Sequence, residues 1–470
     1  MSSLYSVRDF IEKVKLGEVD LGDFYSKLFD ELKKINERFN LLITLGTSEV
    51  CKEVKGKLAG LPVSVKDNIC TKGMRTTAGS KILENYRPLF DATAVARIKS
   101  QGGFIIGKTN MDEFGFGTFS TNSAYGPPKN PHDPSRACGG SSGGAAGLVA
   151  ALDYPHIALG QSTGGSISCP ASFCGVVGLT PTYGRVSRYG LIDYANSMDK
   201  IGPIAKTVED VALMLSVISG YDERDFTTSE RPKEDYTKYL NQDIKGMKIA
   251  VPKEYFGEGV NEGVKEKVWN AVKLLESYGA SYEEVSLPLT AKGIATYYII
   301  ATSEASTNLA KFCGMRYGAE EEIHEEDFNR YFSRIRTKYF GEEAKRRILL
   351  GTYARMAGYR DQYYLKALKV RTKIIMEFKA VFKKHDVIIA PTMPCIAPKF
   401  SEIEKMDPLK VYMMDTLTVP HNLAGIPSLS VPCGKIQGMP VGMHIIGDHF
   451  QEGRIIAVGD FYEKNCKNLI

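Results

Sequence analysis

The stretch GGSSGGAAGLVAALDYPHIALGQSTGGS, residues 139–166, contains the clearest structural signals in this 470-residue chain. Residues 145–151 are small or aliphatic and predict a helix, and the apolar residues 157–159 predict a short buried strand. A glycine–serine loop lies at each end, at residues 139–144 before the helix and 163–166 after the strand. The first loop taken alone resembles a flexible linker, but its neighbours are not linker-like. This order of elements predicts a layered α/β fold.

Short β-branched runs alternate with helical segments on both sides of this stretch, from about Leu61 onward. Such alternation predicts helices packed on a largely buried sheet. The predicted strands are residues 61–65, 104–106, 157–159, 247–251 and 387–389.

The first forty residues, 1–40, predict two N-terminal helices. Ser6 followed by Asp9 is a capping-box pattern, and apolar residues continue from there at helical spacing to Val14. Gly17 is expected to end the first helix, and a second amphipathic helix follows it.

Residues from about 290 to 385 are mostly helical in pattern and strongly basic. Between Arg330 and Lys384 there are 16 Lys or Arg residues and 4 Asp or Glu residues. This charge is typical of a solvated helical face, and a contact with a polyanion is the alternative. Because sheet-like segments occur on both sides of this region, we expect one domain, residues 1–470, with a helical insertion at about 290–385.

The composition is that of a soluble globular protein, with 43% hydrophobic and 24% charged residues. The net charge of +5 is small for this length and gives no indication of a nucleic-acid partner. The nine cysteines form no CxxC pattern or Cys/His cluster, which predicts reduced thiols in a cytoplasm and no bound metal. We expect neither a signal peptide nor a membrane span, because charged residues interrupt the N-terminus and the apolar runs are short.

The two glycine–serine loops suggest a site for an anion or an oxyanion, because glycine lets several backbone N–H groups approach one atom. A serine nucleophile in such a loop also needs a base. None of the seven histidines lies in either loop, although a histidine distant in sequence could still reach it. Lys66 follows the apolar residues 61–65 and is the other option. A lysine is usually solvated, but a desolvated one loses its charge and can act as a base near neutral pH.

Residues 102–109 match the phosphate-loop pattern G-x-x-x-x-G-K-[ST] but lack its structural context. A phosphate loop follows a strand and opens a helix, whereas Phe104, Ile105 and Ile106 inside this motif are themselves strand-like. We therefore do not expect Lys108 to bind a phosphate, and a nucleotide-binding protein is a minor alternative.

Taken together, four motifs of the chain resemble those of the amidase signature family. The motifs are residues 60–68 (GLPVSVKDN), 139–144 (GGSSGG), 163–167 (TGGSI) and 173–179 (FCGVVGL). The resemblance implies a large mixed β-sheet covered by helices and a Ser–cis-Ser–Lys mechanism. Ser166 would be the nucleophile, Ser141 the relay serine and neutral Lys66 the base, with Ser142 still open as the relay. The oxyanion hole would consist of backbone amides, those of Thr163, Gly164 and Gly165.

Within that family, the chain resembles the glutamine-hydrolysing subunits of tRNA-dependent amidotransferases over nearly its whole length. The resemblance implies that Arg347 binds the carboxylate of glutamine and Asp415 its α-amino group, whereas the residues alone would suggest a surface arginine and a helix cap. It also implies a heterotrimer with two other subunits. A partner would use ATP and magnesium to amidate Glu-tRNA(Gln), Asp-tRNA(Asn) or both, and would make most of the contacts to the aminoacyl-tRNA. No cofactor is expected in this chain.

One departure from the family lies in the nucleophile loop. The family usually has an Asp before Thr-Gly-Gly-Ser and an Arg after Ser-Ile, whereas here these positions are Ser162 and Ser168. Their joint loss suggests that the two were ion-pair partners, since losing both is far less costly than losing one. Two other functions stay open: a free-standing amidase of the same fold, and a scaffold subunit with weakened catalysis.

Overall fold

The structure is a computed structural model that describes residues 6–47, 55–323 and 327–466. The predicted ranges 1–40 and 290–385 therefore include a few residues, 1–5 and 324–326, outside the described part. An 11-stranded sheet forms the core, with the strand order β1-β3-β2-β6-β8-β7-β12-β13-β11-β9-β10. Pairing is parallel between β2 and β3 and between β2 and β6, but antiparallel from β6 to β8 and across to β11. The sheet is therefore mixed, as predicted.

The strands are β1 (Leu42–Leu45), β2 (Pro62–Lys66), β3 (Phe104–Thr109), β6 (Ile157–Ser162), β7 (Val177–Thr180), β8 (Lys200–Ala205), β9 (Lys248–Pro252), β10 (Ser281–Val285), β11 (Val387–Pro391), β12 (Ser428–Ile436) and β13 (Met439–Ile446). A separate small hairpin pairs β4 (Lys129–Asn130) with β5 (Asp133–Ala137). All five predicted strands are present, each shifted or extended by a few residues. Four strands at the centre of the sheet were not predicted from the sequence: β7, β8, β12 and β13.

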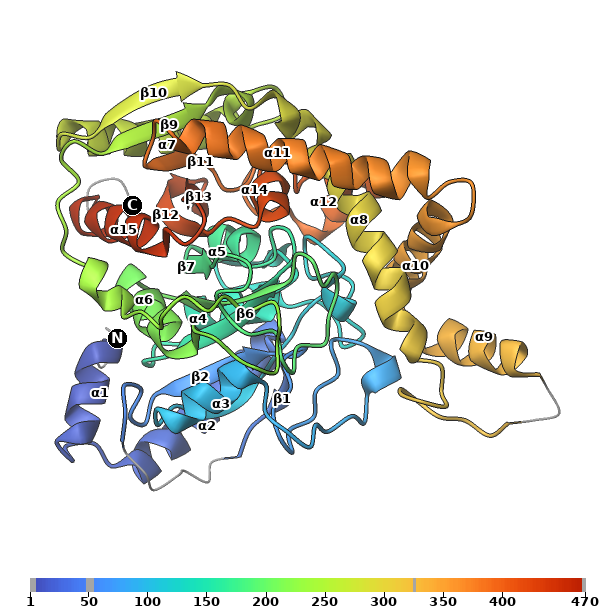
Figure 1. Ribbon diagram of the computed structural model, residues 1–470. Coiled ribbons are helices and arrows are strands. Elements are labelled where there is room, and N and C mark those ends of the chain that lie inside the picture. Colours follow the sequence, from blue (N-terminus) through green and yellow to red (C-terminus); the bar gives the residue numbers. More distant parts are fainter. Residues whose placement is uncertain (1–5, 48–54, 324–326, 467–470) are drawn as a thin grey trace.

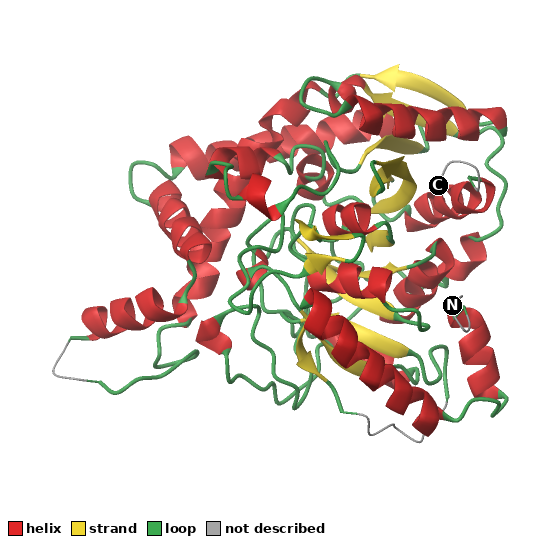
Figure 2. Ribbon diagram, turned by 180° about the vertical axis from the view of Figure 1, so that it is seen from behind, coloured by secondary structure: helices red, strands yellow, loops and turns green. Residues whose placement is uncertain are grey.

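Helices cover both faces of this sheet (Figures 1 and 2). On one face, α2 (Leu21–Phe39), α4 (Gly143–Ala151) and α5 (Ser168–Cys174) share an apolar cluster with Ala158 of β6 and Ile204 of β8. On the other face lie α3 (Thr93–Ser100), α6 (Val208–Ile218) and α15 (Glu452–Asn465). The cover is completed by α1 (Val7–Lys15), α7 (Glu262–Ser277), α12 (Phe400–Ile403), α13 (Pro408–Met413) and α14 (Val419–Ala424).

The two N-terminal helices form as predicted. The hydroxyl of Ser6 accepts a hydrogen bond from the Asp9 amide at 3.1 Å, which caps the start of α1. Gly17 adopts φ +74° just after this helix, a conformation that favours glycine. In the described residues, no helix is long and apolar enough to cross a membrane.

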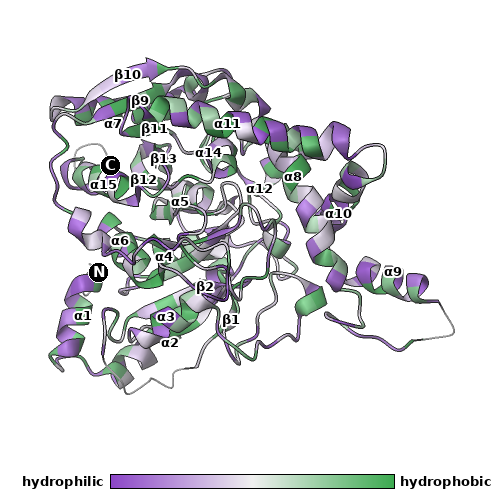
Figure 3. Ribbon diagram, in the orientation of Figure 1, coloured by the Kyte–Doolittle hydropathy of each residue, from purple (hydrophilic) through white to green (hydrophobic). Residues whose placement is uncertain are grey.

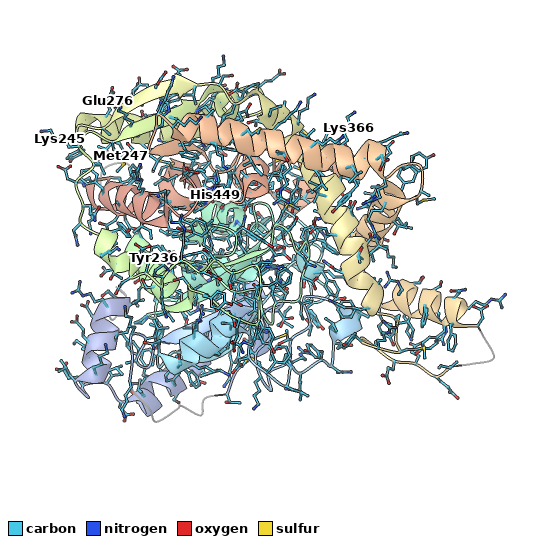
Figure 4. The ribbon with its side chains drawn as sticks, in the orientation of Figure 1. Tyr236, Lys245, Met247, Glu276, Lys366 and His449 are labelled. Atoms are coloured by element: carbon cyan, nitrogen blue, oxygen red, sulfur yellow. The ribbon has the colours of Figure 1, made fainter. Side chains whose placement is uncertain are left out.

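The predicted helical region contains α8 (Gly293–Asn308), α9 (Phe328–Tyr339), α10 (Glu342–Arg355) and α11 (Lys366–Phe382). In Figure 1, α8, α9 and α10 lie to the right of the sheet, whereas α11 runs across the upper part of the molecule. In the chain, the region lies between β10 and β11. The exposed face of α11 is basic, with Lys366, Lys369 and Lys373 exposed, and Figure 3 shows many hydrophilic residues on this helix. Lys366 lies at the start of α11 on the outer surface (Figure 4).

Candidate functional site

Lys66 is the last residue of β2, and its side chain is fully buried. Its amine donates hydrogen bonds to the hydroxyl of Ser141 at 2.7 Å, to the backbone oxygen of Gln161 at 2.9 Å and to the side-chain oxygen of Gln161 at 3.2 Å. Burial lowers the pKa of Lys66 to about 7, against the opposing charges of Asp112 and Asp199. A large fraction of this amine is therefore neutral near neutral pH, which is what a base requires.

Ser141 and Ser142 precede α4 and have different surroundings. The peptide bond between Gly140 and Ser141 is cis, and the Ser141 hydroxyl lies against the Lys66 amine. The Ser142 hydroxyl instead donates to the backbone oxygen of Gln161 at 3.1 Å. Ser141 is therefore the serine of the pair that contacts the candidate base.

Ser166 lies in the loop between β6 and α5 and is 7% exposed. Its backbone oxygen accepts a hydrogen bond from the Ser142 amide at 3.2 Å, which connects the two glycine loops. The backbone amides of residues 163–166 donate to no acceptor within the described residues. Four successive N–H groups are thus available to a ligand atom, as an oxyanion hole requires.

The two glycines of this loop leave no room for a side chain. A Cβ at Gly164 would lie 3.1 Å from the hydroxyl of Tyr297, and a Cβ at Gly165 would lie 2.5 Å from that of Thr418. Tyr297 and Thr418 therefore pack directly on the loop that carries Ser166.

A buried hydrogen-bond network around Asp199, the residue before β8, holds the loop. The hydroxyl of Thr163 donates to Asp199 at 2.5 Å, and the Gln161 amide donates to both Thr163 and Asp199. The other carboxylate oxygen of Asp199 accepts from the backbone amides of Tyr194 and Ala195. Burial raises the pKa of Asp199 to about 7.

Arg347 lies on α10 and is 2% exposed. Its Nε donates to Glu343 at 2.8 Å and its Nη1 to the hydroxyl of Tyr194 at 2.5 Å. The guanidinium also lies 5.2–5.6 Å from four aromatic ring centres, those of Phe116, Tyr194, Tyr298 and Tyr412. Its Nη2 donates to no described residue and remains available for a carboxylate.

Asp415 is 8% exposed, and its Oδ2 accepts hydrogen bonds from Tyr298 at 2.9 Å and from Thr118 at 3.1 Å. Its Oδ1 accepts none from the described residues. Burial raises the pKa of Asp415 to about 6, and the Tyr298 and Thr118 hydrogen bonds and the charge of Arg347 oppose this rise. Since Tyr298 contacts both Arg347 and Asp415, the two charged groups are neighbours.

Both charged groups are linked to the nucleophile loop by short contact paths. The hydroxyl of Thr418, which packs on Gly165, donates to the backbone oxygen of Asp415 at 3.2 Å. Tyr194, the partner of Arg347, has its ring centre 6.4 Å from that of Tyr297, which packs on Gly164. The fold thus brings together every site residue that the sequence predicted, from five separate segments of the chain.

Three buried polar residues around Lys66 and the glycine loops were not singled out from the sequence. These are Gln161 and Asp199, described above, and Asp112, which lies beside Gly140 and has its pKa raised to about 6 by burial. Of these three residues, only Gln161 could have been suspected from the sequence, because it lies close to the second glycine–serine loop. Lys108, by contrast, is buried in β3 and donates to the Ile69 backbone oxygen and to Thr76, so it is not available to a phosphate.

Several known proteins are similar to this chain over most of its length. A family model described as Amidase matches residues 7–456. The chain is similar to a glutamyl-tRNA(Gln) amidotransferase subunit from Methanococcoides burtonii, with 54% identity over 88% of this chain and 86% of the relative. The protein of the same description from Halothermothrix orenii is 50% identical over 97% of this chain and 95% of the relative.

Solved structures lead to the same family. The crystal structure of a glutamyl-tRNA(Gln) amidotransferase subunit from Thermotoga maritima superimposes with a TM-score of 0.85 at 42% identity, over 99% of this chain and 95% of that chain. A bacterial aryl acylamidase of the amidase signature family superimposes equally well, with a TM-score of 0.85, at 25% identity over 98% of this chain and 96% of that chain. With the family model covering nearly all of the chain and relatives at about half identity, the chain belongs to the amidase family.

Proposed function

We propose that the chain is the glutamine-hydrolysing subunit of a tRNA-dependent amidotransferase. The observation that carries this proposal is the pair of buried charges, Arg347 and Asp415, beside the nucleophile loop. Glutamine differs from a simple carboxamide by its α-carboxylate and α-amino group, so a selective site needs one group of each charge. The descriptions of the relatives from Methanococcoides burtonii and Halothermothrix orenii support the same function.

In the proposed first step, the Ser166 hydroxyl attacks the carboxamide carbon of glutamine. The proton of Ser166 passes to Ser141, and the proton of Ser141 passes to the neutral Lys66 amine, with which Ser141 is already in contact. The carbonyl electrons move to the oxygen, which the amides of residues 163–166 stabilise. The required donors are fixed before the reaction, so no reorganisation is needed at that moment.

The tetrahedral adduct then collapses. The C–N bond breaks, and Lys66 returns its proton through Ser141 to the departing nitrogen, which leaves as ammonia. The product on the protein is a glutamyl ester of Ser166. Water hydrolyses this ester by the reverse route and gives glutamate, which restores Ser166, Ser141 and the neutral Lys66.

The ammonia is the product that the complex uses. We infer that two further subunits assemble with this chain, and that one of them activates the mischarged aminoacyl-tRNA with ATP and magnesium and makes most of the contacts to it. Ammonia from Ser166 then amidates Glu-tRNA(Gln), Asp-tRNA(Asn) or both. The free cysteines in the described part of the chain fit the reducing cytoplasm, where aminoacyl-tRNA is made.

The test is glutaminase activity of the purified chain, measured alone and after the partner subunits and aminoacyl-tRNA are added. We expect the activity to rise on addition, and the chain to co-purify with two other subunits. A free-standing amidase would instead work at full rate alone and prefer another carboxamide. The Ser166→Ala variant controls for contaminating activity.

A further inference from the structure

Lys200 has a buried amine for which the chemistry described above has no use. It opens β8, is 2% exposed, and its amine has no hydrogen-bond partner among the described residues. Burial lowers the pKa of Lys200 to about 7; the charge of Arg371 adds to this shift, and the charge of Asp199 opposes it. A buried amine without any acceptor is strongly disfavoured, so Lys200 requires a partner of some kind.

The strand register places Lys200 behind the nucleophile loop. Lys200 and Ser162 are direct partners in the antiparallel pair of β8 and β6, so both side chains point to the same face of the sheet. Ile204, four residues along β8, also points to that face and packs with α4 and α5. Asp199, by contrast, holds Thr163 in the site itself.

The same face of the neighbouring strands carries other polar groups that are buried and unpaired. Thr180 of β7 is the direct partner of Ser428 of β12, and both hydroxyls have no partner within the described residues. The hydroxyl of Ser168, at the start of α5, is also buried and has no partner within the described residues. On α14, which also covers this region, the Oδ1 of Asn422 is unpaired. Polar atoms in such numbers indicate bound water.

The two serines that depart from the family pattern belong to this region. Ser162 faces Lys200 across the strand pair, and its hydroxyl donates to the backbone oxygen of Gly164 in the nucleophile loop at 2.7 Å. Ser162 and Ser168 are both much smaller than the Asp and Arg that the family usually has there. The four-carbon side chain of Lys200 points to the same face of the sheet as Ser162.

From this arrangement, we propose that Lys200 is a positioning residue of the acylation site. Its amine, with water bound to it and to the unpaired hydroxyls, supports the nucleophile loop from behind, in the place of the family's Asp and Arg. Positions 162, 168 and 200 therefore act as one unit. The proposal rests on the proposed role of Ser166, because the loop that it positions carries that nucleophile and the oxyanion amides.

The test is a mutant cycle in the full chain assembled with its partners, read out as the rate at which an activated ester acylates Ser166. The cycle compares the natural chain, Lys200→Met, the pair Ser162→Asp/Ser168→Arg, and all three changes together. Methionine keeps the length of the side chain but removes the amine. Ester acylation does not depend on glutamine recognition or on tRNA, so an error in the proposed substrate would not affect this result.

We expect Lys200→Met to slow acylation by about tenfold or more, as a displaced oxyanion donor does. The pair alone should also slow it, because it puts an additional ion pair beside Lys200. All three changes together should restore the acylation rate to within about threefold of that of the natural chain. Such a recovery would mean that position 200 is strongly coupled to positions 162 and 168. The melting temperatures should rank the variants in the same order as the acylation rates.

Two results would overturn the proposal. One is an unchanged acylation rate in Lys200→Met. The other is that Ser162→Asp/Ser168→Arg changes the acylation rate by the same factor in the natural chain and in Lys200→Met. If Lys200→Met does not fold, the triple variant decides alone, since only coupled positions let it fold and react.

Lys108→Gln is the matched control. Lys108 is also buried, but its amine has two hydrogen-bond partners, and we expect no coupling between it and the pair. A crystal structure should show water at the Lys200 amine.

Discussion

At the scale of single residues, the proposed chemistry depends on a lysine that has lost its usual charge. Lys66 is fully buried, and the hydrogen-bond partners of its amine among the described residues are the uncharged Ser141 and Gln161. Burial is the largest contribution to its lowered pKa of about 7. The sequence indicated the position but not this environment, because burial is produced by β3, β6 and the glycine loops, which are distant in the chain.

Lys66→Arg should be about as damaging as Lys66→Ala. Arginine is permanently protonated in proteins and cannot accept the serine proton, so it supplies the charge without the base. We expect both variants to lower the acylation rate of Ser166 by about a hundredfold or more. Nearly normal acylation in the arginine variant would mean that Lys66 contributes only a positive charge.

The pH profile of the unmodified chain tests the same point. The neutral amine predominates above its pKa of about 7, so the acylation rate should rise from pH 6 to 8 and then level off. At one pH unit below the pKa only about a tenth of the amine is neutral. A rate that is constant from pH 6 to 8 would contradict a lysine base.

Ser141→Ala and Ser142→Ala should separate the relay serine from its neighbour. The Ser141 hydroxyl contacts the Lys66 amine, whereas the Ser142 hydroxyl is bonded to the Gln161 backbone oxygen. We expect Ser141→Ala to lower kcat by about a hundredfold or more and Ser142→Ala by less than about tenfold. Steady-state glutamine hydrolysis measures both, and a larger loss in Ser142→Ala would reverse the assignment.

At the scale of elements, α10 and the segment before α14 bring the two glutamine-binding charges to the nucleophile loop. Charge-assisted hydrogen bonds contribute roughly 1.5–3 kcal/mol each, so Arg347→Ala and Asp415→Ala should weaken glutamine capture by about tenfold to a hundredfold. Turnover of a small neutral amide should change little, because it has neither charge. Comparing kcat/KM for both substrates is the measurement, and equal losses for the two would indicate a general structural defect.

The close packing of α10 on α8 keeps Arg347 in position. A Cβ at Gly351 would lie 1.8 Å from the backbone oxygen of Thr302 on α8, which no side-chain rearrangement can relieve. Gly351→Ala should therefore push the helices apart, cost about 1–3 kcal/mol of folding free energy and raise the KM for glutamine. Thermal unfolding and kinetics measure the two effects. Thr352→Ala, on the exposed side of α10, is the control and should change neither.

β12 and β13 are among the strands that were not predicted from the sequence. β12 and β13 form a hairpin around Gln437 and Gly438, both with positive φ, as a two-residue hairpin turn requires. The Gln-Gly pair gives a weaker signal than Asn-Gly, and apolar runs of this kind do not separate strand from helix. The predicted strands are short apolar runs near glycine or proline, such as residues 61–65 in β2 and 157–159 in β6.

At the scale of the whole molecule, the site exists because the fold brings five distant segments together. Arg347 and Asp415 are far from Ser166 in the chain, and no periodicity connects them. They were predicted only through the resemblance to a family, whereas Lys66 and the glycine loops stand out on chemical grounds as well. Asp112 and Asp199 could not be predicted, because isolated acidic residues give no signal until the fold buries them.

The central claim is that Ser166 serves only to generate ammonia, which the rest of the complex consumes. The most direct measurement compares glutamine-dependent and ammonia-dependent amidation of aminoacyl-tRNA by complexes that contain the natural chain or the Ser166→Ala variant. We predict that Ser166→Ala abolishes the glutamine-dependent reaction and leaves the ammonia-dependent reaction largely intact. An equal loss of both reactions would contradict the claim.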